Sequence, residues 1–329
     1  MADIINITFE DRTKPLTEVG LNKILVLTKS KKVPYKETND VASVSELIQS
    51  DTGYELLEMV LAQNKQDVAV FGDTTLAAAT IAQLLNPIIG KDFFFIVTDL
   101  VSDEDITALA KWATSADRIL IATPDKTTTA TKAVALANTI NSSNVALYKH
   151  LSKEKNIWLN AGITGLMSPK PAGSATWALK SPNLIPKEYF PLADENEMIK
   201  GNVNVWAEEL GRGITKGGKT TDGSYIDITH GKYWLKNKLR AELSLLLMNR
   251  DKVPFTAEGK ALILSAIEPV ITAGDRQGII IRDETTIRIP DPLDLLTNDR
   301  ANRKWNGIEI ETRIQGAVES MDVKFILNV

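Results

Sequence analysis

The chain has 329 residues, of which 43% are apolar and 24% charged, a composition typical of a folded protein with one or two domains. Its net charge of -4 gives the whole surface no attraction for nucleic acid or an anionic membrane, and the absence of cysteine excludes disulfides, thiol nucleophiles and zinc-thiolate sites. Because no signal peptide is visible and no apolar run reaches the ~20 residues of a membrane span, we expect a soluble protein that folds in the cytoplasm.

Apolar and polar residues alternate at both ends of the chain, a pattern typical of β-strands. The apolar positions are Ile5, Ile7 and Phe9 near the start and Met321, Val323, Phe325, Leu327 and Val329 at the end. A terminal strand has an unpaired edge, so these strands either pair within their own domain or are donated to neighbouring copies.

Short apolar strands alternate with amphipathic helices from residue 21 to about residue 160. Strands are predicted at 23–28, 68–71, 93–97, 118–122 and 145–148, and helices at 54–62, 76–85, 103–112 and 128–140, with Asp103 as a helix cap. This order predicts an α/β domain with a mostly parallel sheet and helices on its faces.

The second half of the chain does not continue this alternation of strands and helices. Residues 160–200 are rich in glycine, proline and serine and indicate a connector. A β-ribbon is predicted at 202–228, helices at 232–249 and 257–273, a hairpin at 278–289 and a strand at 308–314. We therefore expect an N-terminal arm (1–20), an α/β domain (21–200), an α+β domain (201–306) and a C-terminal strand arm (307–329).

Residues 213–220 match the phosphate-binding pattern G-x-x-x-x-G-K-[ST]. That chemistry requires a buried strand before the loop and a helix after it. Here the stretch from Glu208 to Arg212 is polar, and a strand is expected around Tyr225, so a glycine-rich turn explains the residues better. A nucleotide-dependent α/β enzyme remains the alternative interpretation.

Other candidate sites are weaker. His150 and His230 have no metal-ligand spacing and are predicted to lie in the surface or in loops. Asp99, Asp103, Glu104 and Asp105 cluster after a strand, but helix capping and the helix dipole account for the last three. We expect no catalytic residue, no metal and no cofactor.

Positive charge concentrates between residues 232 and 252. The basic residues are Lys232, Lys236, Lys238, Arg240, Arg250 and Lys252, and the acidic ones are Glu242 and Asp251, so six minus two gives +4. Lys236 and Arg240 are four residues apart on one helix face, and Leu235, Leu239, Leu243, Leu246 and Leu247 are expected on the opposite, core-facing side. The excess indicates either a solvated face or docking on an acidic partner.

Several spaced motifs form a recognisable series. They are Ala175-Thr176-Trp177, Asn202-Val203-Asn204-Val205-Trp206, Gly223-Ser224-Tyr225-Ile226-Asp227, Tyr233-Trp234-Leu235, Val253-Pro254-Phe255-Thr256-Ala257-Glu258-Gly259, Asp299-Arg300-Ala301-Asn302-Arg303 and Gly316-Ala317-Val318. In order and spacing, the region from Asn202 onward resembles the C-terminal domain of contractile tail sheath proteins, found in myovirus-type phages and phage-tail-like bacteriocins.

The resemblance implies a structural subunit rather than an enzyme. Such subunits stack as hexameric rings into a helical sheath around a tail tube and contract to drive the tube through the host envelope. Implied partners are further copies of the chain, the tail tube protein, and baseplate and tail terminator proteins, with no nucleic acid or membrane. The implied location is the virion tail, assembled in the host bacterial cytoplasm.

The resemblance also assigns roles to surfaces. The terminal arms would add strands to adjacent subunits, which makes Ile5, Ile7, Phe9, Met321, Val323, Phe325 and Leu327 the intersubunit candidates. The C-terminal domain would face the tube through Lys232, Lys236, Lys238 and Arg240, and the α/β domain would lie outside. A non-contractile polymerising protein, such as a tube or surface-layer subunit, remains a further alternative.

Overall fold

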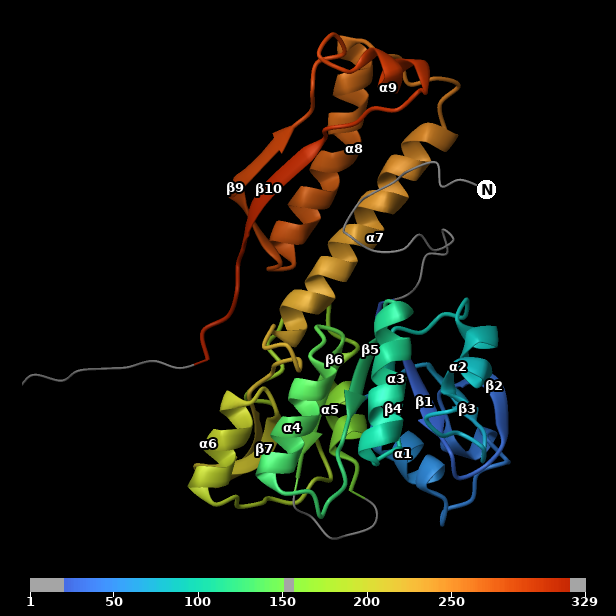
Figure 1. Ribbon diagram of the computed structural model, residues 1–329, viewed down its shortest axis with the longest axis vertical. Coiled ribbons are helices and arrows are strands. Elements are labelled where there is room, and N and C mark those ends of the chain that lie inside the picture. The colour runs from blue at the N-terminus through green and yellow to red at the C-terminus, as the bar shows by residue number, and fades with distance from the viewer. Residues whose placement is uncertain (1–20, 151–156, 320–329) are drawn as a thin grey trace, which may run out of the picture. The chain divides into compact units, whose positions relative to one another are not determined.

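The computed structural model describes residues 21–150 and 157–319, and these fall into two compact units (Figure 1). The sheet unit contains residues 21–150, 157–171, 175–227 and 316–319, and the helix-pair unit contains residues 172–174 and 228–315. The predicted fold class is confirmed, with a mostly parallel α/β sheet followed by an α+β region. The predicted strands at the extreme termini lie outside the described residues.

The sheet unit is built on eight strands in the order β2-β3-β1-β4-β5-β6-β7-β8. Their bounds are β1 (Ile24–Thr28), β2 (Val33–Thr38), β3 (Val68–Gly72), β4 (Phe95–Thr98), β5 (Ile119–Ala122), β6 (Val145–Lys149), β7 (Asn204–Glu209) and β8 (Arg212–Lys216). The six inner strands are parallel, and β2 and β8 join the edges in antiparallel orientation. Every residue of β1, β4, β5 and β6 is buried, as a sheet covered on both faces requires.

Helices cover the two faces unequally. On one face α2 (Ile81–Leu85), α3 (Asp103–Ser115), α4 (Ala130–Ile140) and α6 (Leu192–Lys200) share a core with alternate residues of β1, β4 and β5, including Leu25, Ile96 and Leu120. On the other face α1 (Thr52–Leu61) packs against α5 (Leu159–Met167). Figure 1 shows α3 and α4 side by side on the first face.

Several local predictions for the sheet unit are wrong. The predicted 76–85 helix is reduced to α2 and a 3₁₀ turn at Asn86–Ile88, and Ser102, not Asp103, caps α3 by accepting the Asp105 N–H.

Strand β2 was not predicted from the sequence. It contains Pro34, which an edge strand tolerates but which argues against a strand in the sequence. The 160–200 connector begins with α5 and ends with α6. A Cβ at Gly165 would lie 2.5 Å from the Val60 carbonyl oxygen, so this helix glycine permits close packing on α1.

The helix-pair unit contains α7 (Ile226–Met248), α8 (Ala257–Arg276), β9 (Ile280–Arg288), α9 (Thr297–Ala301) and β10 (Glu309–Ile314), with the division between units near the start of α7. Its buried core residues are Leu239, Ile263, Ile267, Val270, Ile271, Ile279, Ile280 and Ile289. The predicted 278–289 hairpin is wrong: β9 is one strand that pairs antiparallel with β10. Thr256 caps α8 by accepting the Gly259 N–H.

The predicted ribbon at 202–228 is correct only for its first two strands. They form the β7–β8 hairpin, which extends the large sheet through β6, so residues 201–227 lie in the sheet unit and not beyond a boundary at residue 200. The strand predicted around Tyr225 and Ile226 is wrong, because α7 starts at Ile226 and Tyr225 forms only an isolated bridge with Lys219. Three alternating residues are too few to separate a strand period from a helical one.

Candidate assembly surfaces

The carboxyl ends of β1 and β4 form the point where the strand order of the sheet reverses, which is where doubly wound sheets commonly bind ligands. Here Asp99 follows β4 directly and is buried. Its carboxylate accepts hydrogen bonds from the hydroxyls of Thr28 (2.6 Å) and Thr52 and from the Lys29 N–H (3.0 Å). The acid therefore ties β1 to the start of α1.

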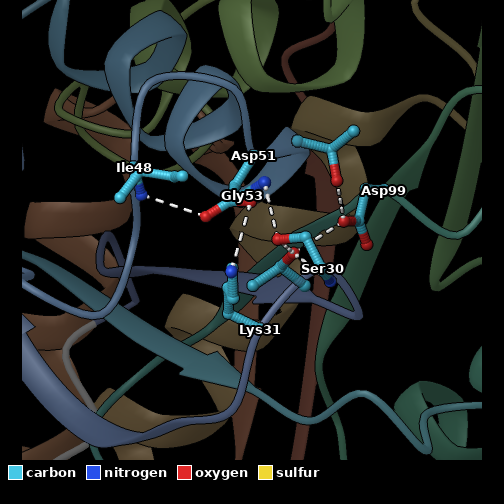
Figure 2. A network of polar contacts seen from close by, with 8 residues as sticks. Ser30, Lys31, Ile48, Asp51, Gly53 and Asp99 are labelled. Carbon is cyan, nitrogen blue, oxygen red and sulfur yellow. Dashed lines mark hydrogen bonds and ion pairs between the residues drawn. The ribbon is translucent and has the colours of Figure 1, made fainter.

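Hydrogen bonds between residues of the chain fill this end of the sheet. The Gly53 N–H donates to Ser30 Oγ at 3.2 Å, and Ser30 Oγ lies 2.8 Å from Thr28 Oγ1 (Figure 2). A Cβ at Gly53 would lie 2.7 Å from Thr28 Oγ1, so the first turn of α1 presses directly on β1. The polar groups that would hold a ligand are paired with one another, which indicates a brace rather than a binding crevice.

The acidic cluster after β4 is dispersed in the structure. Asp99 enters the brace, whereas Asp105 accepts the Ala78 N–H at 2.7 Å and Asp103 and Glu104 are exposed in the first turn of α3. Among the described residues, no group of three histidine, cysteine or acidic side chains is placed to hold a metal.

The P-loop-like residues lack the local structure that phosphate binding needs. Gly213 to Lys216 form part of β8, antiparallel to β7, and Gly217 and Gly218 turn the chain with φ values of 110° and 68°. The Lys219 N–H donates to Asn204 Oδ1 at 2.7 Å, and its ammonium group lies 5.6 Å from the Tyr225 ring centroid. The segment is a glycine-rich turn, as its sequence flanks predicted.

The prediction of a surface or loop position is right only in part: His150 follows β6 outside any helix or strand, whereas His230 lies in α7, and both residues are buried rather than at the surface. His150 Nδ1 lies 3.6 Å from Glu188 Oε1, and this glutamate is also buried. Beside it, Lys149 donates to the carbonyl oxygens of Asp125 (2.6 Å) and Lys126 (2.9 Å), and burial lowers its pKa to about 8. This polar layer ties the end of β6 to surrounding loops.

The basic segment forms part of α7. Lys232 is exposed, Lys238 pairs with Glu242 at 2.9 Å, and Lys236 and Arg240 are half-buried. Leu243 and Leu247 follow Lys236 and Arg240 by seven residues, two helical turns, so they lie on nearly the same side and not opposite.

The leucines of α7 differ in burial. Leu235, Leu239, Leu243 and Leu246 pack in the core, whereas Leu247 is 39% exposed, against prediction. The two cations therefore border the leucine stripe.

Strands β9 and β10 form a two-stranded sheet. Among the described residues each pairs only with the other, and two strands alone are marginally stable. Their exposed side chains form ion pairs, Arg313 with Glu284 at 3.2 Å and Arg288 with Glu309 at 3.9 Å. Within residues 21–150 and 157–319 no other strand occupies the outer edges of this sheet, so further strands can add there.

An open groove of about 1070 Å³ runs over α2, α3 and α4. Its lining includes Ala78, Ala82, Ala108 and Ala135 above the apolar side chains of Ile81 and Trp112. Charged side chains also line it, with Asp103 and Glu104 at the start of α3 and Lys111 and Lys132 further along. We call this surface the alanine groove.

Comparisons with known proteins agree with the sequence resemblance. Residues 226–286, from α7 into β9, match the family described as "E217 tail sheath protein gp31-like, C-terminal domain". A chain of the cryo-EM structure of the anti-feeding prophage (AFP) baseplate, 6-fold symmetrised, has the same fold, with a TM-score of 0.70 at 12% identity over 100% of both chains. No curated protein matches. The resemblance to tail sheath proteins is thus confirmed for the region from α7 into β9. No helix among the described residues is able to cross a membrane.

Proposed function

We propose that this tail sheath-like chain is the subunit of a contractile sheath in a phage or phage-like tail, and that it polymerises helically around an inner tube. The observation that carries the proposal is the tail sheath match over residues 226–286, within a chain whose whole length has the fold of a baseplate-assembly chain. Contraction of the polymer would drive the tube through the host envelope. The chain acts through its surfaces, and no catalytic step is part of the proposal.

Strand addition to β9 and β10 is the proposed link between copies. In support, this sheet has two strands among the described residues, and β9 begins within the matched region while β10 follows it. The apolar residues at the extreme termini, Ile5, Ile7, Phe9, Met321, Val323, Phe325 and Leu327, are the proposed donors. Main-chain hydrogen bonds give such links affinity, and they persist while subunits rotate, because the connecting segments hinge.

The tail tube is the proposed partner of α7, through Lys232, Lys236, Lys238 and Arg240. The baseplate and tail terminator are proposed at the two ends of the polymer. The sheet unit is proposed to lie on the outside, where its closed strand ends serve as a rigid scaffold. The particle is proposed to assemble in the cytoplasm of the host bacterium.

The test is electron microscopy of the purified chain and of a variant that lacks residues 322–329. The full-length protein should form helical tubes or stacked rings, and the variant should remain a monomer with an unchanged circular dichroism spectrum. Normal tubes from the truncated chain would contradict strand donation by the C-terminus. Tubes that never contract would favour the non-contractile alternative, and a full-length chain that stays monomeric would contradict the proposed function.

A further inference from the structure

The turn of the β7–β8 hairpin contains a residue type that is unusual at its position. Glu209 pairs with Arg212, so the loop contains only Leu210 and Gly211, with φ values of 47° and 79°. A two-residue hairpin with positive φ at both positions favours Asn-Gly or Gly-Gly, because a side chain with a Cβ is strained there. This chain has leucine at the first position, and the side chain is 96% exposed. Backbone strain and solvent exposure both disfavour this choice in the isolated chain.

Two further apolar side chains lie on the chain segment beside this hairpin. Tyr189 and Leu192 are 73% and 71% exposed. The segment is held against the hairpin, since the Glu208 N–H donates to the Glu188 carbonyl oxygen at 2.9 Å. We call Tyr189, Leu192 and Leu210 the hairpin-tip patch. Strained residues and exposed apolar groups of this kind mark interaction sites.

The alanine groove has complementary properties. It is lined with alanine side chains that leave room for a bulky apolar one, and its volume far exceeds that of a single leucine. Its acids Asp103 and Glu104 have no ion-pair partner within the described part of the chain, and neither has Arg212, which follows the hairpin turn. A docked tip would bring this arginine to the acidic end of the groove, where Asp103 and Glu104 lie in the first turn of α3.

We propose that the hairpin-tip patch of one copy docks into the alanine groove of a second copy, an inference that rests on the proposed self-assembly. The tip lies at the β8 edge of the sheet, whereas the groove lies over α2, α3 and α4. A contact between two different surfaces is head-to-tail and continues from copy to copy instead of closing as a dimer. It is separate from strand addition in the helix-pair unit.

The first test is Leu210→Asn, which has two opposite expected effects. Asparagine tolerates the turn conformation, so the unassembled variant should melt at a higher temperature than the wild type. Its assembly should weaken, with the concentration needed for sedimentable polymer rising at least tenfold. Leu184→Asn is the matched control, because Leu184 also has a positive φ of 64° and is 67% exposed but lies outside the patch. It should stabilise the monomer and leave assembly unchanged.

The second test uses the absence of native cysteine. Leu210→Cys combined with Ala135→Cys, a groove position, should give a ladder of disulfide-linked oligomers on mild oxidation. Leu210→Cys with Ser45→Cys, an exposed position outside the groove, should not. If the wild type polymerises and the groove pair gives no ladder, the docking proposal is overturned and the sheath proposal stands. A ladder from a chain that forms no tubes would support docking and overturn the sheath proposal, and failure of both overturns both.

Discussion

At the scale of single residues, the buried carboxylate of Asp99 decides what the end of the sheet can do. It joins β1, β4 and the start of α1 through three hydrogen bonds, two of them from hydroxyl groups. A buried acid that accepts three hydrogen bonds from these elements stabilises one arrangement of them. The position that often binds a ligand in related architectures is therefore a structural brace here.

Asp99→Asn should destabilise the chain by about 1–3 kcal/mol, because the amide replaces one acceptor oxygen with a donor that faces the hydroxyl groups. The free energy of unfolding in urea measures the change. Asp103→Asn is the control, since this acid is exposed and its loss should stay within about 0.5 kcal/mol. Equal effects of the two substitutions would contradict the brace.

Lys149 gives the chain a pH dependence of known sign. Burial lowers its pKa to about 8 in the folded state, whereas an unfolded lysine titrates near ~10.4. Between these two values the unfolded chain holds a proton that the folded chain has released, so the Lys149 contribution to stability rises with pH. Burial also raises the pKa of Tyr148, which acts in the opposite direction only above pH ~10.

The measurement is the free energy of unfolding at pH 7.5 and 9.5 for the wild type and Lys149→Met. The wild type should gain stability relative to the variant as the pH rises. A constant difference between the two proteins would show that Lys149 keeps its proton in the folded state.

At the scale of elements, α7 combines a core stripe and a charged border on one helix. Lys236 and Arg240 lie beside the packed leucines, so they are less mobile than side chains on a fully solvated face. A partly ordered cation loses less side-chain entropy when it meets an acidic partner. The position thus suits docking on a tube surface, although each contact contributes only ~0.2–1 kcal/mol.

Lys236→Glu with Arg240→Glu should therefore yield particles with a detached or already contracted sheath, while the isolated subunit folds normally. Many weak contacts repeat along a polymer, so a small change per subunit has a large total effect. Lys32→Glu with Lys65→Glu, two exposed positions of the sheet unit outside the alanine groove, is the charge-matched control for tube attachment. Normal extended tails from the α7 double variant would refute the assignment.

At the scale of the whole molecule, the chain is divided into two differently built units. The sheet unit has a closed strand end and an antiparallel hairpin where the P-loop pattern occurs. The helix-pair unit has a two-stranded sheet with edges for further strands. A chain with this division is suited to assembly, because the sheet unit is rigid and the helix-pair unit offers strand edges for links to other copies.

The chain should accordingly show no affinity for nucleotide. Calorimetric titration with Mg-ATP is expected to give no heat of binding, and Lys219→Ala should behave like the wild type. Micromolar binding that disappears in Lys219→Ala would revive the enzyme interpretation and contradict the turn seen at Gly217 and Gly218.

The sequence by itself determined the elements that carry a clear period. Continuous apolar runs such as residues 24–27 predicted buried parallel strands, and the leucine spacing of α7 predicted a long helix with a core face. Local caps were less certain, since Ser102 and Asp103 are adjacent and both types of residue cap helices. The tail sheath resemblance was also visible, because spaced motifs survive in the order of the chain.

Only the tertiary structure decided which elements pair and what is buried between them. The β7–β8 hairpin joins the large sheet through β6, and β9 pairs with β10 across twenty intervening residues, from residue 289 to residue 308. His150 and His230 are buried because of elements that pack over them, which no local pattern records. Strand pairing and burial depend on the surface that a distant segment presents. They are therefore properties of the folded chain and cannot be deduced from a short stretch of its sequence.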